Sequence, residues 1–109
     1  MNPREIIERF YKCCIGEDPE GKVLLDSGVV YEMTGDVEIQ VNGPDAVFSY
    51  LSRRRPGHAR QLLFIRSVED GTEAEFRLVA PDAEEQIVTE RAVVRQGRIA
   101  AFSARSVVD

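Results

Sequence analysis

Hydrophobic and polar positions follow different periods in the two halves of the chain. Before residue 56, apolar residues recur at helical spacing in three segments, and one short hairpin pattern lies between the second and the third. From residue 58 onward, four long segments carry strand patterns with no helical segment between them. This order predicts an α+β domain in which a curved, cone-shaped antiparallel sheet wraps around the N-terminal helices, with a pocket where the two layers meet.

The first two helical segments have recognisable ends. The first begins with a capping residue, a first-turn proline and a capping-box glutamate at Asn2, Pro3 and Glu5. Gly16 ends this helix, whose apolar face comprises Ile6, Ile7, Phe10, Tyr11, Cys13 and Cys14. Asp18 and Pro19 repeat the pattern of a cap followed by proline, which predicts a short helix at residues 22–25 that stops near residues 27–28.

The remaining segments predict one hairpin, one helix and four consecutive strands. The hairpin joins residues 29–33 to residues 37–41. After a break at residues 42–45, a helix buries the stripe Val47, Phe48, Tyr50 and Leu51. The four strands are expected at residues 58–68, 72–80, 86–95 and 98–108, and the connections between them suit antiparallel hairpins.

Composition limits the class of protein. With 109 residues, 43% of them apolar and 30% charged, the chain is expected to form a single folded domain spanning residues 1–109. The net charge of −5 argues against nucleic acid or an anionic membrane as the main partner. No apolar run suits a membrane span or a signal peptide, and the adjacent Cys13 and Cys14 suit a reducing compartment, so a cytoplasmic location is expected.

The last predicted strand is apolar on both faces. One face carries Ala100, Phe102, Ala104 and Val108, and the other carries Ile99, Ala101 and Val107. A strand with one face in water should be half polar. The pattern therefore predicts a homodimer in which a second copy covers the outer face of the sheet.

The order of these elements resembles the nuclear transport factor 2-like (cystatin-like) superfamily of α+β cones, which includes the SnoaL-like cyclases and ketosteroid isomerase. The resemblance covers nearly the whole chain through short stretches in the same order: IIERFY (6–11), GED (16–18), VVYEM (29–33), NGPDAV (42–47) and QGRIA (96–100). It implies a pocket between sheet and helices that takes a small-molecule ligand, and often a dimer. It implies no particular reaction, because this fold hosts isomerases, dehydratases, hydrolases and non-enzymatic binders.

Glu90 is the first candidate for chemistry. Its strand face carries otherwise apolar residues: Val88, Ala92 and Val94. It should therefore point into the interior, where a carboxyl group is either paired with a cation or disposed to donate a proton or a hydrogen bond. Arg105 or Arg77 could form a structural ion pair with Glu90, and both interpretations stay open. In the resemblance to ketosteroid isomerase, Glu90 occupies the position of the acidic oxyanion-hole donor.

The same resemblance argues against steroid isomerase activity. Met33 occupies the position of the family's general base, and Glu32, one residue away, should point to the opposite face of the strand. Phe10 occupies the position of the oxyanion-hole tyrosine, and Tyr11 is one residue off, a turn of about 100° around the helix. Two of the three catalytic positions therefore lack their catalytic residue.

A histidine and an aspartate form the competing candidate. His58 is the only histidine of the chain, and histidine suits proton transfer at neutral pH. By resemblance to the dehydratase and dehydrochlorinase branch of the superfamily, Asp18 would orient the imidazole and His58 would abstract the proton. The alternatives are that Asp18 caps a helix and that His58 is a surface residue.

Further side chains are expected to contact a ligand inside the cone: Phe10, Tyr31, Met33, Tyr50 and Ser103. The hydroxyl groups of Tyr31, Tyr50 and Ser103 could add polar contacts, or each could be a core residue with one hydrogen bond. No metal site is expected, because one histidine and two adjacent cysteines cannot assemble one. No phosphate-binding glycine loop is present in the sequence, and no cofactor is expected.

Two functions remain open. In the first, an apolar pocket binds a hydrophobic, ring-bearing metabolite with Glu90 and His58 as polar contacts, with or without proton transfer of the isomerase, cyclase or dehydratase type. In the second, the chain is a non-catalytic dimeric binding or accessory domain of the same fold. An enzyme should show a pH–activity profile governed by carboxyl or histidine groups. The ligand affinity of a binding module should not change when those groups become amides.

Overall fold

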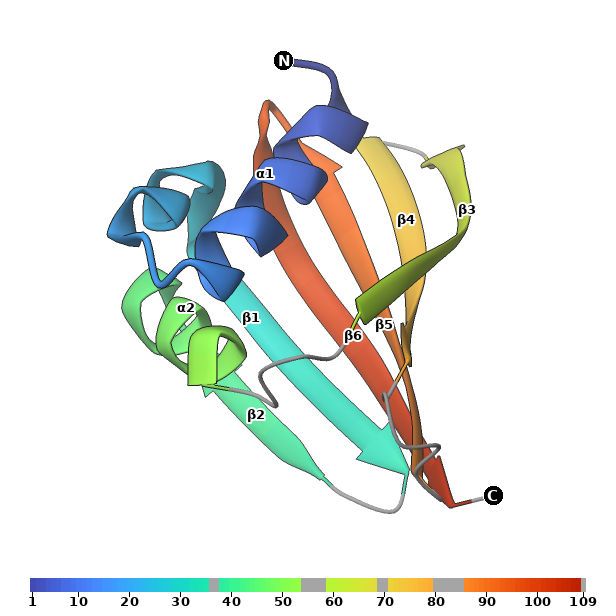
Figure 1. Ribbon diagram of the computed structural model, residues 1–109. Coiled ribbons are helices and arrows are strands. Elements are labelled where there is room, and N and C mark those ends of the chain that lie inside the picture. Colours follow the sequence, from blue (N-terminus) through green and yellow to red (C-terminus); the bar gives the residue numbers. More distant parts are fainter. Residues whose placement is uncertain (36–37, 54–58, 69–70, 80–85, 109) are drawn as a thin grey trace.

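One curved sheet of six strands forms the body of the protein (Figure 1). The computed structural model describes residues 1–35, 38–53, 59–68, 71–79 and 86–108. The strand order across the sheet is β2-β1-β6-β5-β4-β3. In chain order the elements are α1 (Pro3–Ile15), the 3₁₀ helix η1 (Pro19–Leu24), β1 (Leu25–Gly35), β2 (Ile39–Asn42), α2 (Pro44–Arg53), β3 (Ala59–Val68), β4 (Gly71–Val79), β5 (Gln86–Arg95) and β6 (Arg98–Val108).

Strand pairing joins the two halves of the chain. β1 pairs with β2 in an antiparallel hairpin and with β6 in parallel, whereas the successive strands from β3 to β6 are antiparallel. The last strand, β6, therefore lies between β1 and β5 and connects the N-terminal hairpin to the C-terminal strands. The predicted α+β class and curved sheet are confirmed, and the parallel β1–β6 pair departs from the antiparallel expectation.

The helices cover one face of the sheet, here called the inner face (Figure 1). α1 packs against β5 and β6, and α2 packs against β1 and β2. The predicted start of α1 is confirmed, because the Asn2 side chain accepts a hydrogen bond from the Glu5 backbone N–H at 2.9 Å. The buried residues of α1 are the predicted ones: Ile6, Ile7, Phe10, Tyr11, Cys13 and Cys14. Sheet and helices thus enclose one apolar core.

The strand after the second helix begins earlier than the sequence predicts. η1 begins at Pro19 directly after its Asp18 cap, as the cap and proline predict, but β1 already begins at Leu25, where the end of a helix is expected. The β1–β6 pairing is irregular between Leu25 and Val30, and within this stretch the Gly28 N–H donates to the Asp26 carboxylate at 2.9 Å. The turn-forming residues of this stretch therefore make an irregularity inside a strand and do not separate two elements.

A register shift changes which side chains of β6 face outward. Val93 pairs with Ala101 but Val94 pairs with Ile99, so Ala100 is the extra residue of a bulge. Ile99 consequently turns to the inner face, where it is completely buried. The expectation that Ile99 shares the outer face with Ala101 is wrong, and the outer face of β6 is less apolar than strict alternation predicts.

Parts of the sequence prediction fall outside the described residues. They include His58, which precedes β3, and the side chains of Val107 and Val108 at the end of β6. Residue 37 of the predicted hairpin also falls there, and β2 is described from Ile39 onward. Within the described part of the chain, no helix is long and apolar enough to cross a membrane.

Candidate functional site

Glu90 lies on the inner face of β5 and has no exposed surface. Val88 and Ala92 flank it on the same face of β5, and across the sheet it pairs with Phe76 on β4 and Ala104 on β6. These four neighbours are themselves buried. The predicted inward orientation of Glu90 is therefore confirmed. A carboxyl group in such an apolar environment requires hydrogen-bond partners.

Two tyrosine hydroxyl groups donate hydrogen bonds to the carboxyl group of Glu90. The Tyr31 hydroxyl lies 2.7 Å from Oε2, and the Tyr11 hydroxyl lies 3.5 Å from Oε1. Tyr31 comes from β1 and Tyr11 from α1, and both are buried. The Tyr31 bond has the usual length of an O–H···O hydrogen bond, whereas the Tyr11 bond is long. We call the group formed by Glu90, Tyr31 and Tyr11 the carboxyl–tyrosine cluster.

Aromatic rings surround this cluster. The ring centroid of Phe76 lies 5.3 Å from that of Tyr11, and the centroid of Phe102 lies 5.8 Å from that of Tyr31. From α2, the half-buried Tyr50 places its ring centroid 5.1 Å from that of Tyr31. These separations are typical of tilted and edge-to-face aromatic pairs. The cluster therefore offers hydrogen-bonding groups inside an aromatic shell.

Neither arginine considered as an ion-pair partner faces Glu90. Arg77 on β4 and Arg105 on β6 both pair with Thr89, the residue before Glu90 in β5. Successive residues of a strand point to opposite faces, so both arginines lie on the outer face of the sheet, and both are exposed. The interpretation of Glu90 as the partner of Arg77 or Arg105 is therefore wrong.

Tyr11 belongs to the site although the resemblance places it one residue out of position. Phe10 and Tyr11 are both buried, because the apolar face of α1 is wide enough to include two successive residues. Phe10 packs on Phe102 with ring centroids 5.5 Å apart, while Tyr11 reaches Glu90. The width of the apolar stripe on α1 is the sequence signal that points to Tyr11.

Met33 and Glu32 have the orientations that the sequence predicts. Met33 is buried on the inner face, and Glu32 is exposed. Across the sheet, Met33 pairs with Ala104, which in turn pairs with Glu90. The position that resembles the general base of ketosteroid isomerase therefore carries a thioether. Among the described residues, Glu90 is the buried carboxyl group of the inner face.

The predicted hydroxyl contacts divide between the two faces of the sheet. Tyr31 and Tyr50 lie on the inner side, as expected. Ser103 is exposed, because its neighbours Phe102 and Ala104 take the inner positions of β6. The expectation that Ser103 contacts a ligand inside the cone is therefore wrong.

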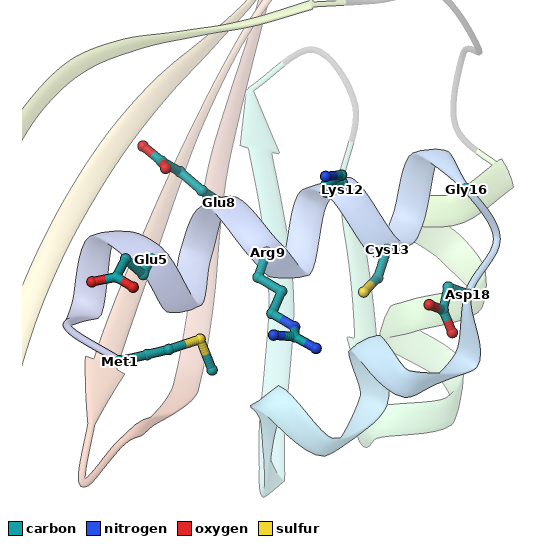
Figure 2. A pocket seen from close by; sticks show the side chains of 8 residues that line it. All are labelled: Met1, Glu5, Glu8, Arg9, Lys12, Cys13, Gly16 and Asp18. Carbon is teal, nitrogen blue, oxygen red and sulfur yellow. The ribbon is translucent and has the colours of Figure 1, made fainter.

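A cavity of about 670 Å³ lies along α1, beside η1 (Figure 2). Its lining mixes charged groups with the thiol of Cys13 and the carboxylate of Asp18. Burial raises the pKa of the Cys13 thiol above its ordinary value, and the negative charge of Asp18 raises the pKa further. A thiol of this kind is a weak nucleophile at neutral pH. This cavity is therefore not a convincing reactive site.

Asp18 has a structural role that accounts for its position. Its carboxylate accepts a hydrogen bond from the Glu20 backbone N–H at 3.0 Å and caps η1. The partner expected for it, His58, lies outside the described residues, so the pair stays a prediction. In the described part of the chain, no three histidine, cysteine or acidic side chains are placed to hold a metal ion.

Comparison with solved structures identifies the fold. A protein of unknown function from Mesorhizobium loti, described as nuclear transport factor 2-like, superimposes with a TM-score of 0.69 at 20% identity, over 94% of this chain and 88% of its own. This chain has the nuclear transport factor 2-like fold. A candidate ketosteroid isomerase from Kribbella flavida shares the fold with a TM-score of 0.69 at 11% identity, over 94% of this chain and 76% of its own.

A designed protein is also among the solved structures that this chain resembles. A de novo designed protein with a curved β-sheet matches with a TM-score of 0.64 at 16% identity, over 100% of this chain and 88% of its own. No protein-family model matches the sequence, and no curated protein matches it significantly. The fold predicted from the order of elements is confirmed, and function must be argued from the site itself.

Proposed function

We propose that this nuclear transport factor 2-like protein binds a hydrophobic, ring-bearing small molecule on the inner side of its sheet. The carboxyl–tyrosine cluster would be the polar contact. The observation that supports this is the complete burial of Glu90 with the Tyr31 hydroxyl at 2.7 Å. Replacing buried polar groups by packed apolar side chains is often neutral or stabilising. Stability alone therefore does not require this cluster, and its polar groups are suited to recognising a polar substituent of a ligand.

The ligand would approach the cluster where the core is only partly covered. The residues that pack against the core while remaining partly exposed lie on α2 and on both edge strands of the sheet: Tyr50 on α2, Ile39 and Val41 on β2, and Leu62 on β3. Tyr50 contacts Tyr31 directly, and Leu62 pairs with Phe76, the strand neighbour of Glu90. A flat ring lying against Tyr50 would gain aromatic contacts, and one lying against Leu62 would gain apolar contacts. Its polar substituent would then point toward the cluster.

We further propose that the bound molecule can undergo proton transfer at Glu90, without a cofactor. A carboxyl group accepts a proton when ionised and donates one when neutral, and the Tyr31 hydroxyl holds it in one orientation. This chemistry suits an isomerase, cyclase or dehydratase. Steroid isomerisation is the least favoured of these, because Met33 stands where the general base would be needed.

A second candidate function is binding without catalysis, in a dimeric accessory domain. The observation that favours it is that Glu90 is fully buried and already holds a short hydrogen bond, as a purely structural group would. The two functions differ in their response to one change. An enzyme loses turnover when Glu90→Gln removes the carboxyl group that transfers the proton, whereas a binding domain keeps its ligand affinity, since glutamine still accepts the Tyr31 hydrogen bond.

Equilibrium binding of 2-naphthol, followed by its fluorescence, tests the main proposal. This probe combines fused rings with one hydroxyl group that can bond to the cluster. Saturable binding is expected, and Tyr31→Phe should weaken it by about tenfold, the loss expected for one hydrogen bond in a buried site. Glu32→Gln is the matched control, because Glu32 is the next residue of β1 but is exposed. The control should bind like the unaltered protein.

Two results would contradict the proposal. The first is an absence of saturable 2-naphthol binding by the folded protein. The second is binding that Tyr31→Phe and Glu32→Gln leave equally unchanged, since the probe would then be held away from the cluster. Circular dichroism of each variant shows whether the fold is retained.

We also propose that the protein forms a homodimer through the outer face of its sheet. Half-buried apolar side chains lie next to one another there, with Val30 on β1 and Val93 on β5 both paired to Ala101 on β6. This row is a smaller apolar surface than the one that the sequence predicts for the outer face. A second copy covering the row would remove it from water.

We propose a cytoplasmic location for the protein. Cys13 and Cys14 are both buried, and both are free thiols. Free thiols persist in reducing compartments, where disulfides are rare. Their state therefore supports the location that the sequence suggests.

A further inference from the structure

A groove of about 430 Å³ crosses the outer face of the sheet, on the opposite side from the carboxyl–tyrosine cluster. Arg91 and Arg105 line it together with three hydroxyl-bearing residues, Thr34, Thr89 and Ser103. Leu63, which is 45% exposed, lies along the same groove. The carboxylate of Glu75 also lines the groove, which thus combines two cations and one anion with hydroxyl and apolar groups on one surface.

The register of the strands brings the polar groups together. Arg105 on β6 pairs with Thr89 on β5 and with Thr34 on β1, so these three side chains form one row across the sheet. Directly paired residues on one face of a sheet have Cβ atoms about 5 Å apart. In the next row, Ser103 pairs with Arg91. Both arginines therefore line the same groove as the hydroxyl groups.

The two arginines differ in how they are held. Arg91 is fixed by acidic neighbours, with its guanidinium 3.2 Å from the Glu75 carboxylate and 3.3 Å from that of Glu73. Glu73 also binds Arg66 at 2.9 Å, so Glu73 is shared by two cations. Among the described residues, Arg105 forms no ion pair. An unpaired cation beside three hydroxyl groups is notable on a protein whose net charge is −5.

The geometry points to a binding site for the phosphate group of a small phosphorylated molecule, held by Arg105, Arg91 and the hydroxyl groups around them. Guanidinium groups bind phosphate through paired hydrogen bonds, and hydroxyl groups donate to its remaining oxygens. Donors arriving from three strands suit a tetrahedral anion with several acceptor oxygens better than a planar carboxylate. The remainder of the molecule would lie along the groove over Leu63.

This groove is separate from the ligand site proposed on the inner face and from the apolar row proposed as the dimer interface. The Thr34–Arg105–Thr89 row lies four residues along each strand from the Val30–Ala101–Val93 row, a distance of about 13 Å. A second copy seated on the apolar row therefore leaves space for a small anion at the other end of the face. Loss of phosphate binding would not affect the 2-naphthol site.

Titration with inorganic phosphate and with phenyl phosphate at constant ionic strength, followed by amide chemical shifts, tests the inference. Saturable shifts are expected at Thr34, Thr89, Ser103 and Arg105. Arg105→Gln should weaken the affinity by about tenfold, and Arg105→Lys by less, because lysine keeps the charge but not the paired donors. Arg98→Gln is the matched control, an exposed arginine at the other end of the same strand. It should leave the affinity unchanged.

The two phosphates distinguish a free ion from a phosphorylated molecule. Phenyl phosphate should bind more tightly if its ring contacts Leu63, and Leu63→Ala should remove that advantage. Equal affinities would overturn the assignment to a phosphorylated molecule. Shifts that rise linearly without saturation, or an Arg105→Gln variant that matches Arg98→Gln, would overturn the site itself. A change of molecular mass in Arg105→Gln would instead assign this arginine to a contact between copies and would also overturn the inference.

Discussion

The Tyr31 hydroxyl donates a 2.7 Å hydrogen bond to Glu90 across an intervening strand. Tyr31 lies on β1 and Glu90 on β5, and β6 runs between these two strands. On β6, Phe102 pairs with Tyr31 and Ala104 pairs with Glu90. The small side chain of Ala104 leaves room for the phenol to reach the carboxyl group. The bond therefore links the N-terminal hairpin to the C-terminal strands at the parallel junction of the sheet.

Removing the two hydroxyl groups of the cluster should have unequal effects on stability. Tyr31→Phe removes a short hydrogen bond to a buried carboxyl group, and we expect a loss of about 1–3 kcal/mol in the free energy of unfolding. Tyr11→Phe removes a bond of 3.5 Å, and we expect a loss below about 1 kcal/mol. Urea unfolding of both variants measures the difference. Equal losses, or a larger loss for Tyr11→Phe, would contradict the geometry.

Local patterns predict the elements of this fold well. The cap and proline of α1, its buried face and the inward direction of Tyr31, Met33 and Glu90 all follow from periodicity alone. Each depends on residues a few positions apart, which the helical and strand periods relate directly. The cone topology followed from the order of elements and is confirmed by the comparisons.

Features that depend on pairing between distant segments were not predictable in this way. The bulge at Ala100 reverses the face of Ile99, and only the pairing of β5 with β6 reveals it. The hydrogen bond from Tyr11 to Glu90 joins residues 79 positions apart. The exposure of Ser103, by contrast, follows from strand alternation alone, which places it on the opposite face from Phe102. Such contacts are properties of the assembled sheet and not of a single segment.

Gly21 should tolerate no side chain, although its backbone conformation is ordinary. A Cβ atom at this position would lie 2.8 Å from Cys13 Cβ and 2.9 Å from a ring carbon of Phe48, between α1 and α2. We expect Gly21→Ala to lower the free energy of unfolding by about 1–3 kcal/mol through overpacking. Gly16→Ala is the matched control, because its Cβ would meet only ordinary contact at 3.6 Å. Thermal unfolding compares them, and a neutral Gly21→Ala would show that the helices can separate without cost.

The thiol of Cys13 should react slowly, and a neighbouring charge should contribute to this. Burial raises the pKa of this thiol and Asp18 raises it further, so less thiolate is present at a given pH than for an ordinary cysteine. We expect Asp18→Asn to lower the thiol pKa and to speed alkylation by iodoacetamide at pH 8. The increase should stay below about tenfold, because burial, the larger cause, remains.

Asp18→Asn distinguishes the effect of the Asp18 charge on Cys13 from the effect of Asp18 as the cap of η1. Asparagine caps helices as well as aspartate does, so η1 should stay intact in Asp18→Asn. Cys13→Ser supplies the background rate from Cys14, which is 1% exposed. An Asp18→Ala variant that reacts much faster than Asp18→Asn would show that loosening of η1 controls the rate. An unchanged rate in Asp18→Asn would remove the electrostatic contribution of Asp18.

Assembly through the outer face of the sheet depends on one short apolar row. Light scattering at micromolar concentration should give the mass of two chains for the unaltered protein. Ala101→Asp should give the mass of one chain, because it would bury a carboxylate against Val30 and Val93 in the interface. Ala46→Asp, an exposed change on α2, should leave the dimer intact. A single-chain mass for the unaltered protein would contradict the dimer and would mean that this face is in contact with water. The neighbouring arginine–glutamate ion pairs are polar and are compatible with such exposure.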